Sequence, residues 1–455
     1  MIIIPETIKN KWTREYPPGP KGHFLVGSLW EYTQNPLDFF SNCVAEYGDI
    51  VHWKTLGKSS YLINRPDEIE DIFVTQANSF TKINFGYWIN LILGKGLVTN
   101  EGDFWQRQRR LIQPGFYRQR LNNYGNWMVD YTQKLLENWQ GGETRDICQD
   151  MQNLSLEIIT HFLFGFDSCN QQDDINRIIK LSNECFDLLH QITSQQKQIW
   201  FSTHKKQHFY STLKQLDHTI YKVIQNRRKT VKDFGDLLSM LLHLPENGNH
   251  EMDDQQLRDE LVTLLIAGRE TISMALAWTW YLLSQHPEIE AQLIAELRRV
   301  LGGRKPTPED LPNLPYTNMV FMETLRLYPP DWLLTRKVIK ECEIGGYTLP
   351  ANSNIFISAW LIQRDRRFFE NPELFQPQRW NPSFTKQLPK FAYFPFGGGG
   401  RACIGKSLAM MEAILVLATI AQQFSLKLID HTVVEPLATI TLRPKSQLKM
   451  LLTRR

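Results

Sequence analysis

The sequence predicts a mainly α-helical fold with a smaller β-rich part. Helical spacing of apolar residues dominates residues 123–243 and 253–285, and short alternating apolar runs lie near both ends of the chain and around 340–360. Of the 455 residues, 42% are hydrophobic, which is ample for one large core. We therefore expect a single domain over residues 1–455, with residues 1–16 as a lead-in.

The first part of the chain mixes strands with helices. Its prolines make the segment Tyr16–Pro20 extended. Residues 51–63 alternate around Gly57 and predict a hairpin, whereas residues 67–74 have helical spacing. A further helix is expected to begin at Phe104.

The longest helical pattern covers residues 253–285 and follows a loop at 245–249. The middle of this pattern is apolar on nearly all sides, so the helix is expected to cross the core. Residues 342–357 alternate like strands around a turn at Gly345-Gly346. Residues 432–453 predict a terminal hairpin.

The composition excludes several classes of protein. A net charge of +3 gives no sign of nucleic acid binding. Met1–Pro5 is too short for a signal peptide, and the uncharged stretch Thr271–Pro287 is interrupted by polar residues, which favours a buried helix over a membrane span. The cysteines form no CxxC pair, which suits a reducing compartment; they are residues 43, 148, 169, 185, 342 and 403. We expect a soluble, cytoplasmic protein.

The most informative stretch surrounds Cys403. The four glycines Gly397–Gly400 let the backbone lie flat against a large partner. An apolar helical pattern follows through Ala418, and a cysteine at a helix start lies where the helix dipole favours the thiolate, a strong ligand of soft metals. The stretch therefore indicates a thiolate ligand for the metal of a flat macrocycle.

Two other interpretations of this stretch stay open on local sequence alone. Cys403 is compatible with a structural cysteine in a turn. Gly400–Ser407 fits the phosphate loop of a P-loop NTPase, with Leu426–Asp430 as the strand that ends in a metal-binding aspartate. Pro395 disfavours the central strand that a phosphate loop needs, and the 25 residues after Asp430 are too few for further βα units.

The segment Ala267–Thr271 places polar residues inside the apolar helix. Buried Glu270 and Thr271 are costly unless something uses them. A threonine bonded to its own helix can hold a water, a glutamate can relay protons, and Gly268 would make room for a ligand. The alternative is a satisfied polar pair within the core.

Three smaller patterns involve charged residues. Trp105 and Arg109 are four residues apart and share one helix face. Glu323 and Arg326 face one way in another helix, as many surface pairs do. Arg379 follows a proline-rich loop.

Together these motifs resemble the cytochrome P450 family of haem-thiolate monooxygenases, from Pro17 to Pro444. The signature Phe-x-x-Gly-x-Arg-x-Cys-x-Gly, the Glu-x-x-Arg motif, the Ala-Gly-x-Glu-Thr motif and the Trp-x-x-x-Arg pair occur in the family's order. The matching residues are Phe396, Gly399, Arg401, Cys403, Gly405, Glu323, Arg326, Ala267, Gly268, Glu270, Thr271, Trp105 and Arg109. The sequence departs from the family's frequent residues at Arg269, Gln363 and Trp380.

The resemblance implies the family's fold, with haem b between the long central helix and the Cys403 loop. It implies a monooxygenase that activates O₂ reductively, with Cys403 as the iron ligand and with Thr271 and Glu270 delivering protons. The expected cofactor-binding residues are Trp105, Arg109, Ala267, Gly268, Arg336, Phe396, Arg401, Cys403 and Gly405. Glu323, Arg326 and Arg379 are expected to form a buried structural network.

The resemblance also implies a separate electron donor, because no flavin or iron–sulfur module fits beside the haem domain. Electrons from NAD(P)H would arrive through a reductase and a ferredoxin or flavodoxin. An acidic donor would be attracted by a basic cluster, although most of its arginines are equally compatible with a solvated basic face. The arginines are Arg107, Arg109, Arg110, Arg118 and Arg120. We expect a monomer. Two other haem functions stay open, a peroxide-rearranging enzyme and a non-catalytic sensor.

The pocket expected by family position is apolar or aromatic throughout, which predicts a lipophilic substrate such as a fatty acid or a terpenoid. Its expected residues are Phe85, Tyr87, Trp88, Val98, Ile266, Ala267, Trp332, Leu333, Leu334 and Ile440. Lys58 stands where a fatty-acid-hydroxylating branch of the family carries a basic anchor, and is equally compatible with a solvated turn lysine.

Overall fold

The computed structural model describes residues 16–84, 86–165, 172–194, 203–230, 232–243, 252–429 and 433–455. Its contacts divide the chain into two compact units. The first unit contains the residues up to Ile83 together with 325–375 and 380–403. The second unit contains residues 84–324, 376–379 and 404–455. The predicted loop at 245–249 and the predicted pocket residue Phe85 lie outside the described residues.

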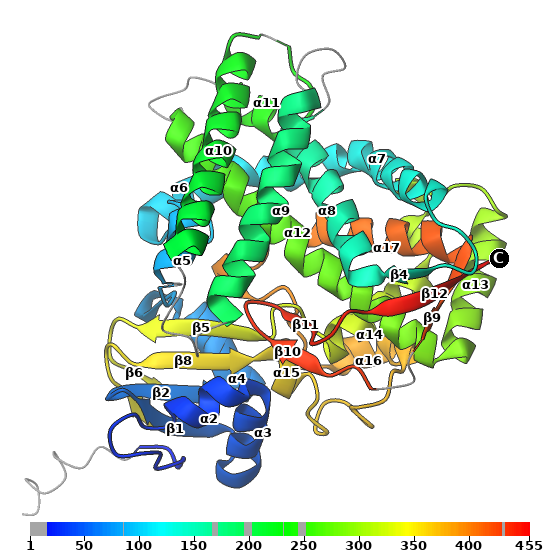
Figure 1. Cartoon of the computed structure of the whole chain (residues 1–455). Coiled ribbons are helices and arrows are strands. Elements are labelled where there is room, and N and C mark those ends of the chain that lie inside the picture. Colours follow the sequence, from blue (N-terminus) through cyan, green and yellow to red (C-terminus); the bar gives the residue numbers. More distant parts are fainter. Residues whose placement is uncertain are drawn as a thin grey trace, which may run out of the picture. The chain divides into compact units, whose positions relative to one another are not determined.

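The first unit is built around a five-stranded sheet whose strands come from both ends of the unit's sequence (Figure 1). In sheet order the strands are β1 (Ile50–Thr55), β2 (Lys58–Ile63), β8 (Asn354–Ser358), β5 (Leu333–Val338) and β3 (Phe80–Thr81). The β1–β2 pair is the antiparallel hairpin predicted at 51–63, and β2 pairs with β8 in parallel. The turn predicted at Gly345-Gly346 is confirmed, because it joins β6 (Cys342–Ile344) to β7 (Tyr347–Leu349).

Short helices and an aromatic core complete the first unit. The helices are α2 (Leu29–Gln34), α3 (Pro36–Tyr47), α4 (Pro66–Glu70), α15 (Ala359–Ile362) and α16 (Pro382–Gln387). Pro66–Glu70 runs on into a π-helical turn, so the helix predicted at 67–74 is confirmed. The core joins the sheet to the segment that precedes Cys403, since Phe73, Phe391 and Phe394 belong to one buried cluster.

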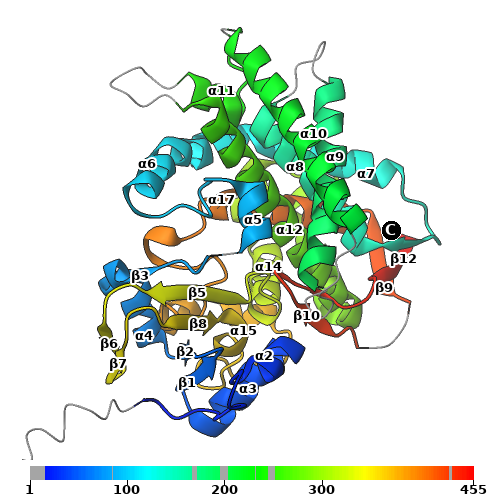
Figure 2. The ribbon, with the colours of Figure 1, turned by 60° about the vertical axis from the view of Figure 1, so that its left-hand side comes forward.

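The second unit is mainly helical (Figures 1 and 2). Its helices are α5 (Tyr87–Leu93), α6 (Gly102–Ile112), α7 (Arg118–Glu137), α8 (Ile147–Phe164), α9 (Gln172–Ser194), α10 (Thr203–Arg228), α11 (Leu237–Leu242), α12 (Asp254–Gln285), α13 (Pro287–Leu301), most of α14 (Pro315–Leu327) and α17 (Lys406–Ala421). The predicted central helix is confirmed as α12, whose N-cap Asp253 accepts the amide of Gln256. Helix α12 packs extensively against α8. Among the residues that the structure describes, α12 alone has the length and hydropathy of a membrane span, and 78% of its most apolar window is buried.

The terminal hairpin predicted at 432–453 is only partly correct. The hairpin is β10 (Pro436–Ala438) with β11 (Leu442–Pro444). The last strand, β12 (Lys449–Arg454), instead pairs antiparallel with β9 (Phe424–Leu428) and β4 (Thr144–Asp146), because this pairing buries Met450 and Leu452 completely. The phosphate-loop interpretation is wrong, since β9 belongs to an antiparallel sheet and no described strand directly precedes Gly400.

Candidate functional site

Cys403 ends a tight loop of the first unit. A 3₁₀ turn covers Gly399–Arg401, and the backbone amide of Cys403 donates to the carbonyl of Phe396 at 2.9 Å. This bond fixes the backbone at the cysteine, while the residue itself is exposed. The predicted cofactor residues Phe396, Arg401 and Cys403 therefore lie in one ordered loop.

Two of the four glycines are required by packing within the protein. A Cβ on Gly399 would lie 1.9 Å from the carbonyl oxygen of Phe73, and a Cβ on Gly398 would lie 2.2 Å from the ring of Phe391. Gly399 also has a φ of 64°, which disfavours other residues. Packing within the protein thus accounts for these two glycines, and their place against a flat partner stays a prediction.

Two further predicted residues lie beside this loop. The guanidinium of Arg336 is stacked over the ring of Phe73, 4.8 Å from its centroid. A methyl of Leu334 lies 3.7 Å from the position that a Cβ on Gly397 would take. Strand β5 therefore brings a cation and an apolar side chain to the Cys403 loop.

The other described cysteines are poor thiolate ligands by comparison. Burial raises the pKa of Cys43, Cys148 and Cys185 to about 12 and also raises that of Cys342. Among the five cysteines that the structure describes, Cys403 alone is exposed. A metal centre that needs a thiolate therefore finds its accessible donor at Cys403.

Helix α12 of the second unit has one accessible face in its middle. Ala267 is exposed and Ile266, Gly268 and Thr271 are half-buried, whereas most neighbouring positions of the helix are buried. The hydroxyl of Thr271 donates to the carbonyl of Ala267 at 2.8 Å. Thr271 thus keeps its hydroxyl on the accessible face of α12 while it is bonded to its own helix.

Glu270 occupies different surroundings from its neighbour in sequence. Its Oε1 accepts the hydroxyl of Thr441 at 3.2 Å, and its Oε2 lies 3.5 Å from both Gln152 Nε2 and Arg269 Nη1. Burial lowers the pKa of Arg269, while the Glu270 carboxylate opposes that shift. Glu270 is 9% exposed and is held by groups from α8, α12 and the residue before β11.

Gly268 does not make room for a ligand in the way predicted. A Cβ at this position would lie 2.6 Å from two side-chain carbons of Ile159. The glycine therefore allows α8 to approach α12 closely. The accessible position on this turn of α12 is Ala267 instead.

The pair Trp105 and Arg109 lies on α6 as predicted, with both side chains half-buried. Arg109 Nε donates to Gln113 Oε1 at 3.4 Å, one turn further along. Gly405 caps the start of α17. The role of these residues toward a cofactor stays a prediction.

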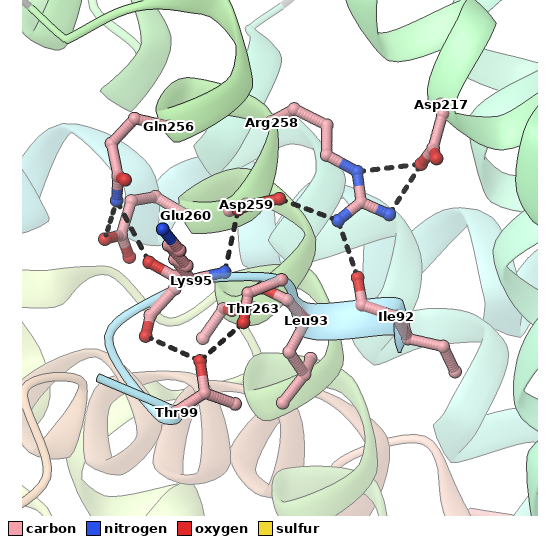
Figure 3. Close-up of polar contacts among 12 residues, drawn as sticks. Ile92, Leu93, Lys95, Thr99, Asp217, Gln256, Arg258, Asp259, Glu260 and Thr263 are labelled. Atoms are coloured by element: carbon pink, nitrogen blue, oxygen red, sulfur yellow. Dashed lines mark hydrogen bonds and ion pairs between the residues drawn. The ribbon is translucent and has the colours of Figure 1, made fainter. Parts of the chain in front are cut away.

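Sequence reasoning missed the polar cluster that fixes the loop after α5 on α12 (Figure 3). The backbone amides of Lys95 and Leu97 donate to Asp259 and Glu260 at 2.7 and 2.8 Å. Arg258 donates to Asp259 at 2.9 Å and also to the carbonyl of Ile92 and to Asp217. In the sequence, Arg258, Asp259 and Glu260 are only adjacent charges near the start of a helix. They give no sign that they hold the loop after α5, because their partners lie far away in the sequence.

The predicted pocket residues are divided between the two units. In the first unit, Trp332 is 5% exposed and packs near Phe40, which are the surroundings of a core residue. Leu333 is half-buried in β5, and Lys58 is exposed at the start of β2.

In the second unit, the ring of Trp88 contacts those of Phe209 and Tyr210, and the hydroxyl of Tyr87 lies 2.9 Å from that of Tyr210. Val98 is half-buried and Ile440 is 44% exposed.

The predicted structural residues are buried. Arg379 Nε donates to Glu323 Oε1 at 2.9 Å in the second unit. Arg326, in the first unit, donates to the carbonyls of Gln363, Pro372 and Leu374. Arg326 thus ties the segment around 363–374 together from a buried position.

Comparison with known proteins identifies the family. The family model for cytochrome P450 matches residues 17–451. The chain belongs to the cytochrome P450 family. The P450 fold is also that of a retinoic-acid-bound cyanobacterial CYP120A1, with a TM-score of 0.85, 25% identity and coverage of 97% of this chain and 100% of the other.

Two bacterial P450 relatives have names that state a substrate. Cyclooctat-9-en-7-ol 5-monooxygenase of Streptomyces melanosporofaciens is 33% identical over 93% of this chain and 92% of its own length. Pentalenene oxygenase of Streptomyces avermitilis is 30% identical over 95% of this chain and 96% of its own length. This P450 is a haem-dependent monooxygenase.

The residues of the Cys403 loop fit a haem iron. The loop offers an exposed thiol on a fixed backbone, and Arg336 and Arg401 are cations suited to carboxylate groups. Buried cysteines with raised pKa values would not supply the thiolate that P450 chemistry requires.

Proposed function

We propose that this P450 hydroxylates a cyclic terpenoid-like hydrocarbon. The observation that carries the proposal is its similarity, over more than nine-tenths of the chain, to two oxygenases named for terpenoid substrates. The accessible face of α12 supports it, because Ile266 and Ala267 offer apolar contacts without a charge. In balance, R–H, O₂, NAD(P)H and a proton give R–OH, water and NAD(P)⁺.

In this proposal Cys403 ligates the iron. Haem supplies the activation of O₂, with the thiolate favouring cleavage of the O–O bond. Trp105, Arg109, Arg336 and Arg401 bind the propionates. Ala267, Phe396 and Gly405 would line the cofactor, whereas Gly268 serves the contact of α12 with Ile159.

Thr271 and Glu270 have separate roles in delivering protons. Thr271 presents its hydroxyl at the accessible face and holds a water through the same oxygen that bonds Ala267. Glu270 exchanges protons from its buried position, where Thr441 and Gln152 hold its carboxylate. Rotation of the Glu270 side chain away from these partners would connect the two groups.

We keep the predicted apolar residues as the proposed substrate contacts, with Trp332, which is 5% exposed, as a supporting core residue. The electron donor is a ferredoxin or a flavodoxin with its reductase, attracted by the arginines of α6 and α7. We propose a monomer that acts in the cytoplasm and a single haem domain that contains both units.

The test is a binding and turnover experiment with the haem-loaded protein. A polycyclic diterpene alcohol is expected to shift the haem from low to high spin at micromolar concentration, and turnover with a ferredoxin, its reductase and NADPH is expected to add one atom from labelled O₂. A long-chain fatty acid and its alcohol are the comparison ligands. If the acid binds better than every terpenoid and Lys58→Ala removes that preference, the terpenoid proposal is wrong.

Turnover also separates the two alternative haem functions. A peroxide-rearranging enzyme would convert a lipid hydroperoxide without NADPH or O₂. A sensor would bind ligands but form no product with any donor. Neither result is expected from a chain with Thr271 and Glu270 arranged as described.

A further inference from the structure

One acidic side chain stands out just before β5 in the first unit. In the run from Pro329 to Trp332, both prolines and the tryptophan are buried, and Asp331 alone is exposed. The two prolines restrict the backbone before Asp331. After it, the carbonyl of Trp332 accepts the amide of Trp360 at 3.4 Å and the hydroxyl of Ser358 at 3.2 Å. The carboxyl group therefore projects from a backbone that is held on both sides.

Asp331 is exposed without being freely solvated. Desolvation by the surrounding protein raises the pKa of its carboxyl group, and the charge of Lys82 opposes this shift. A carboxyl group on an open surface would keep its water, so this one lies in a recess of the first unit. Within the parts of the chain that the structure describes, no group donates a hydrogen bond to it. A ligand that donates one would offset the cost of its desolvation.

Lys82 gives the recess a second polar group. It directly follows β3, the edge strand that pairs with β5 through Thr81 and Lys337, and its side chain is half-buried. Because its charge acts on the carboxyl group of Asp331, the two side chains lie near one another. The recess thus combines a hydrogen-bond acceptor with a cation.

This combination favours a neutral hydroxyl group over a charged one. A carboxylate ligand would be attracted by Lys82 but repelled by Asp331, and an ammonium ligand would meet the reverse. A hydroxyl group both donates and accepts a hydrogen bond and adds no charge. We propose that Asp331, with Lys82 beside it, binds a hydroxyl group that the hydrocarbon framework of the substrate already carries. The inference rests on the proposed function and narrows its substrate class to terpenoid alcohols.

Strand β5 connects this recess to the Cys403 loop. A methyl of Leu334, three residues after Asp331, approaches Gly397 of that loop. Three residues of chain span at most about 11 Å. Asp331 is therefore within reach of a polycyclic substrate that contacts Leu333 and Leu334, which are both half-buried. The predicted set of pocket residues contained no acid, because a single aspartate between a proline and a tryptophan forms no pattern in the sequence.

The hydroxyl group must come from an earlier reaction. A cyclisation that ends with the addition of water supplies it, and so does an earlier oxygenation of the ring system. Oxygenation of a second carbon by this P450 then gives a diol.

The test compares alcohols with their methyl ethers and parent hydrocarbons in the full-length, haem-loaded protein. The spin-state shift of the haem gives dissociation constants for polycyclic sets such as cedrol, cedryl methyl ether and cedrane. The wild type is expected to bind the best alcohol about tenfold or more tightly than its ether and hydrocarbon, because neither of these donates a hydrogen bond. The corresponding amine and carboxylic acid are expected to bind more weakly than the alcohol, since one of the two charges repels each of them.

Two variants of Asp331 assign the preference to its carboxyl group. Asp331→Leu is expected to abolish the preference for the alcohol and to bind the hydrocarbon equally or more tightly, because no desolvated acceptor is left. Asp331→Asn keeps one acceptor oxygen and is expected to retain part of the preference. The matched control is Glu31→Leu, which changes an exposed acid of α2 in the same unit and is expected to leave every dissociation constant unchanged. The reduced carbon monoxide spectrum verifies haem loading in each variant.

Failure of this inference differs from failure of the proposed function. A preference for alcohols that persists in Asp331→Leu overturns the inference, and so does a wild type that binds the amine as tightly as the alcohol. Equal binding of alcohols, ethers and hydrocarbons by the wild type also overturns it, while oxygenation of the hydrocarbons would still support a terpenoid oxygenase. If no terpenoid shifts the haem or is oxygenated, the proposed function is wrong and the role of Asp331 falls with it.

Discussion

Arg379 Nε lies 2.9 Å from Oε1 of Glu323, and the exposed fractions of the two side chains are only 7% and 0%. The same glutamate oxygen accepts the amide of Gln376 at 3.0 Å. Both charged groups are removed from water, so the cost of burying each charge is offset by the opposite charge of its partner. Glu323→Ala is therefore expected to lower the free energy of unfolding by about 3–5 kcal/mol. Urea denaturation and the haem content of purified protein measure this effect.

A surface pair provides the control for that variant. Lys445 and Glu435 are 62% and 67% exposed, so Glu435→Ala is expected to change stability by less than about 1 kcal/mol. Equal effects of the two substitutions would contradict a structural role for Glu323.

Thr271→Ala is expected to uncouple electron consumption from product formation. The substitution removes the hydroxyl at the accessible face of α12 but no core contact, so folding and haem binding should be retained. The measurement compares NADPH consumed with product and hydrogen peroxide formed. Thr279→Ala is the matched control, because Thr279 makes the same bond to Ala275 at 2.8 Å but is fully buried. A proton-delivery role is refuted if both variants couple equally well.

Glu260 gives a pH-dependent prediction. Burial raises the pKa of this glutamate to about 8, against an ordinary value of 4.5. Between these two pKa values, Glu260 holds a proton in the folded protein and has lost it in the unfolded chain. The contribution of Glu260 to the free energy of unfolding therefore falls as pH rises from about 5 to 8. Relative to that of Glu260→Gln, the free energy of unfolding of the wild type is expected to fall by up to about 1.4 kcal/mol for each pH unit. Thermal unfolding of both proteins across this range tests the prediction, and parallel curves would contradict it.

Gly268→Ala is expected to destabilise the protein by about 1–3 kcal/mol, because its Cβ would overlap the Ile159 side chain. The double variant with Ile159→Ala should recover part of that loss, since the overlapping atoms are then absent. A double-mutant cycle followed by thermal unfolding measures the coupling. Additive effects would show that Gly268 does not serve the contact between α8 and α12.

Cys403→Ser is expected to fold but to lose the thiolate-type absorption of the reduced carbon monoxide complex. The backbone bond to Phe396 does not involve the sulfur, and the residue is exposed. Cys342→Ser is the control, because burial raises the pKa of that thiol and its spectrum should be unchanged. An unaltered spectrum in Cys403→Ser would remove the iron-ligand assignment.

The sequence by itself determined the features that depend on local spacing. The length and apolar middle of α12, the hairpin around Gly57 and the Cys403 loop follow from patterns within one segment. Such patterns are readable because helix and strand periods act between near neighbours. The family motifs are local in the same sense.

The tertiary structure alone decided which distant residues meet. It placed Glu270 against Gln152 and Thr441, and it placed Gly268 against Ile159. It also gave β12 its partners β9 and β4 in place of the predicted hairpin. These contacts depend on how whole helices and strands pack, and a helical or alternating period specifies a buried face but not the element that covers it.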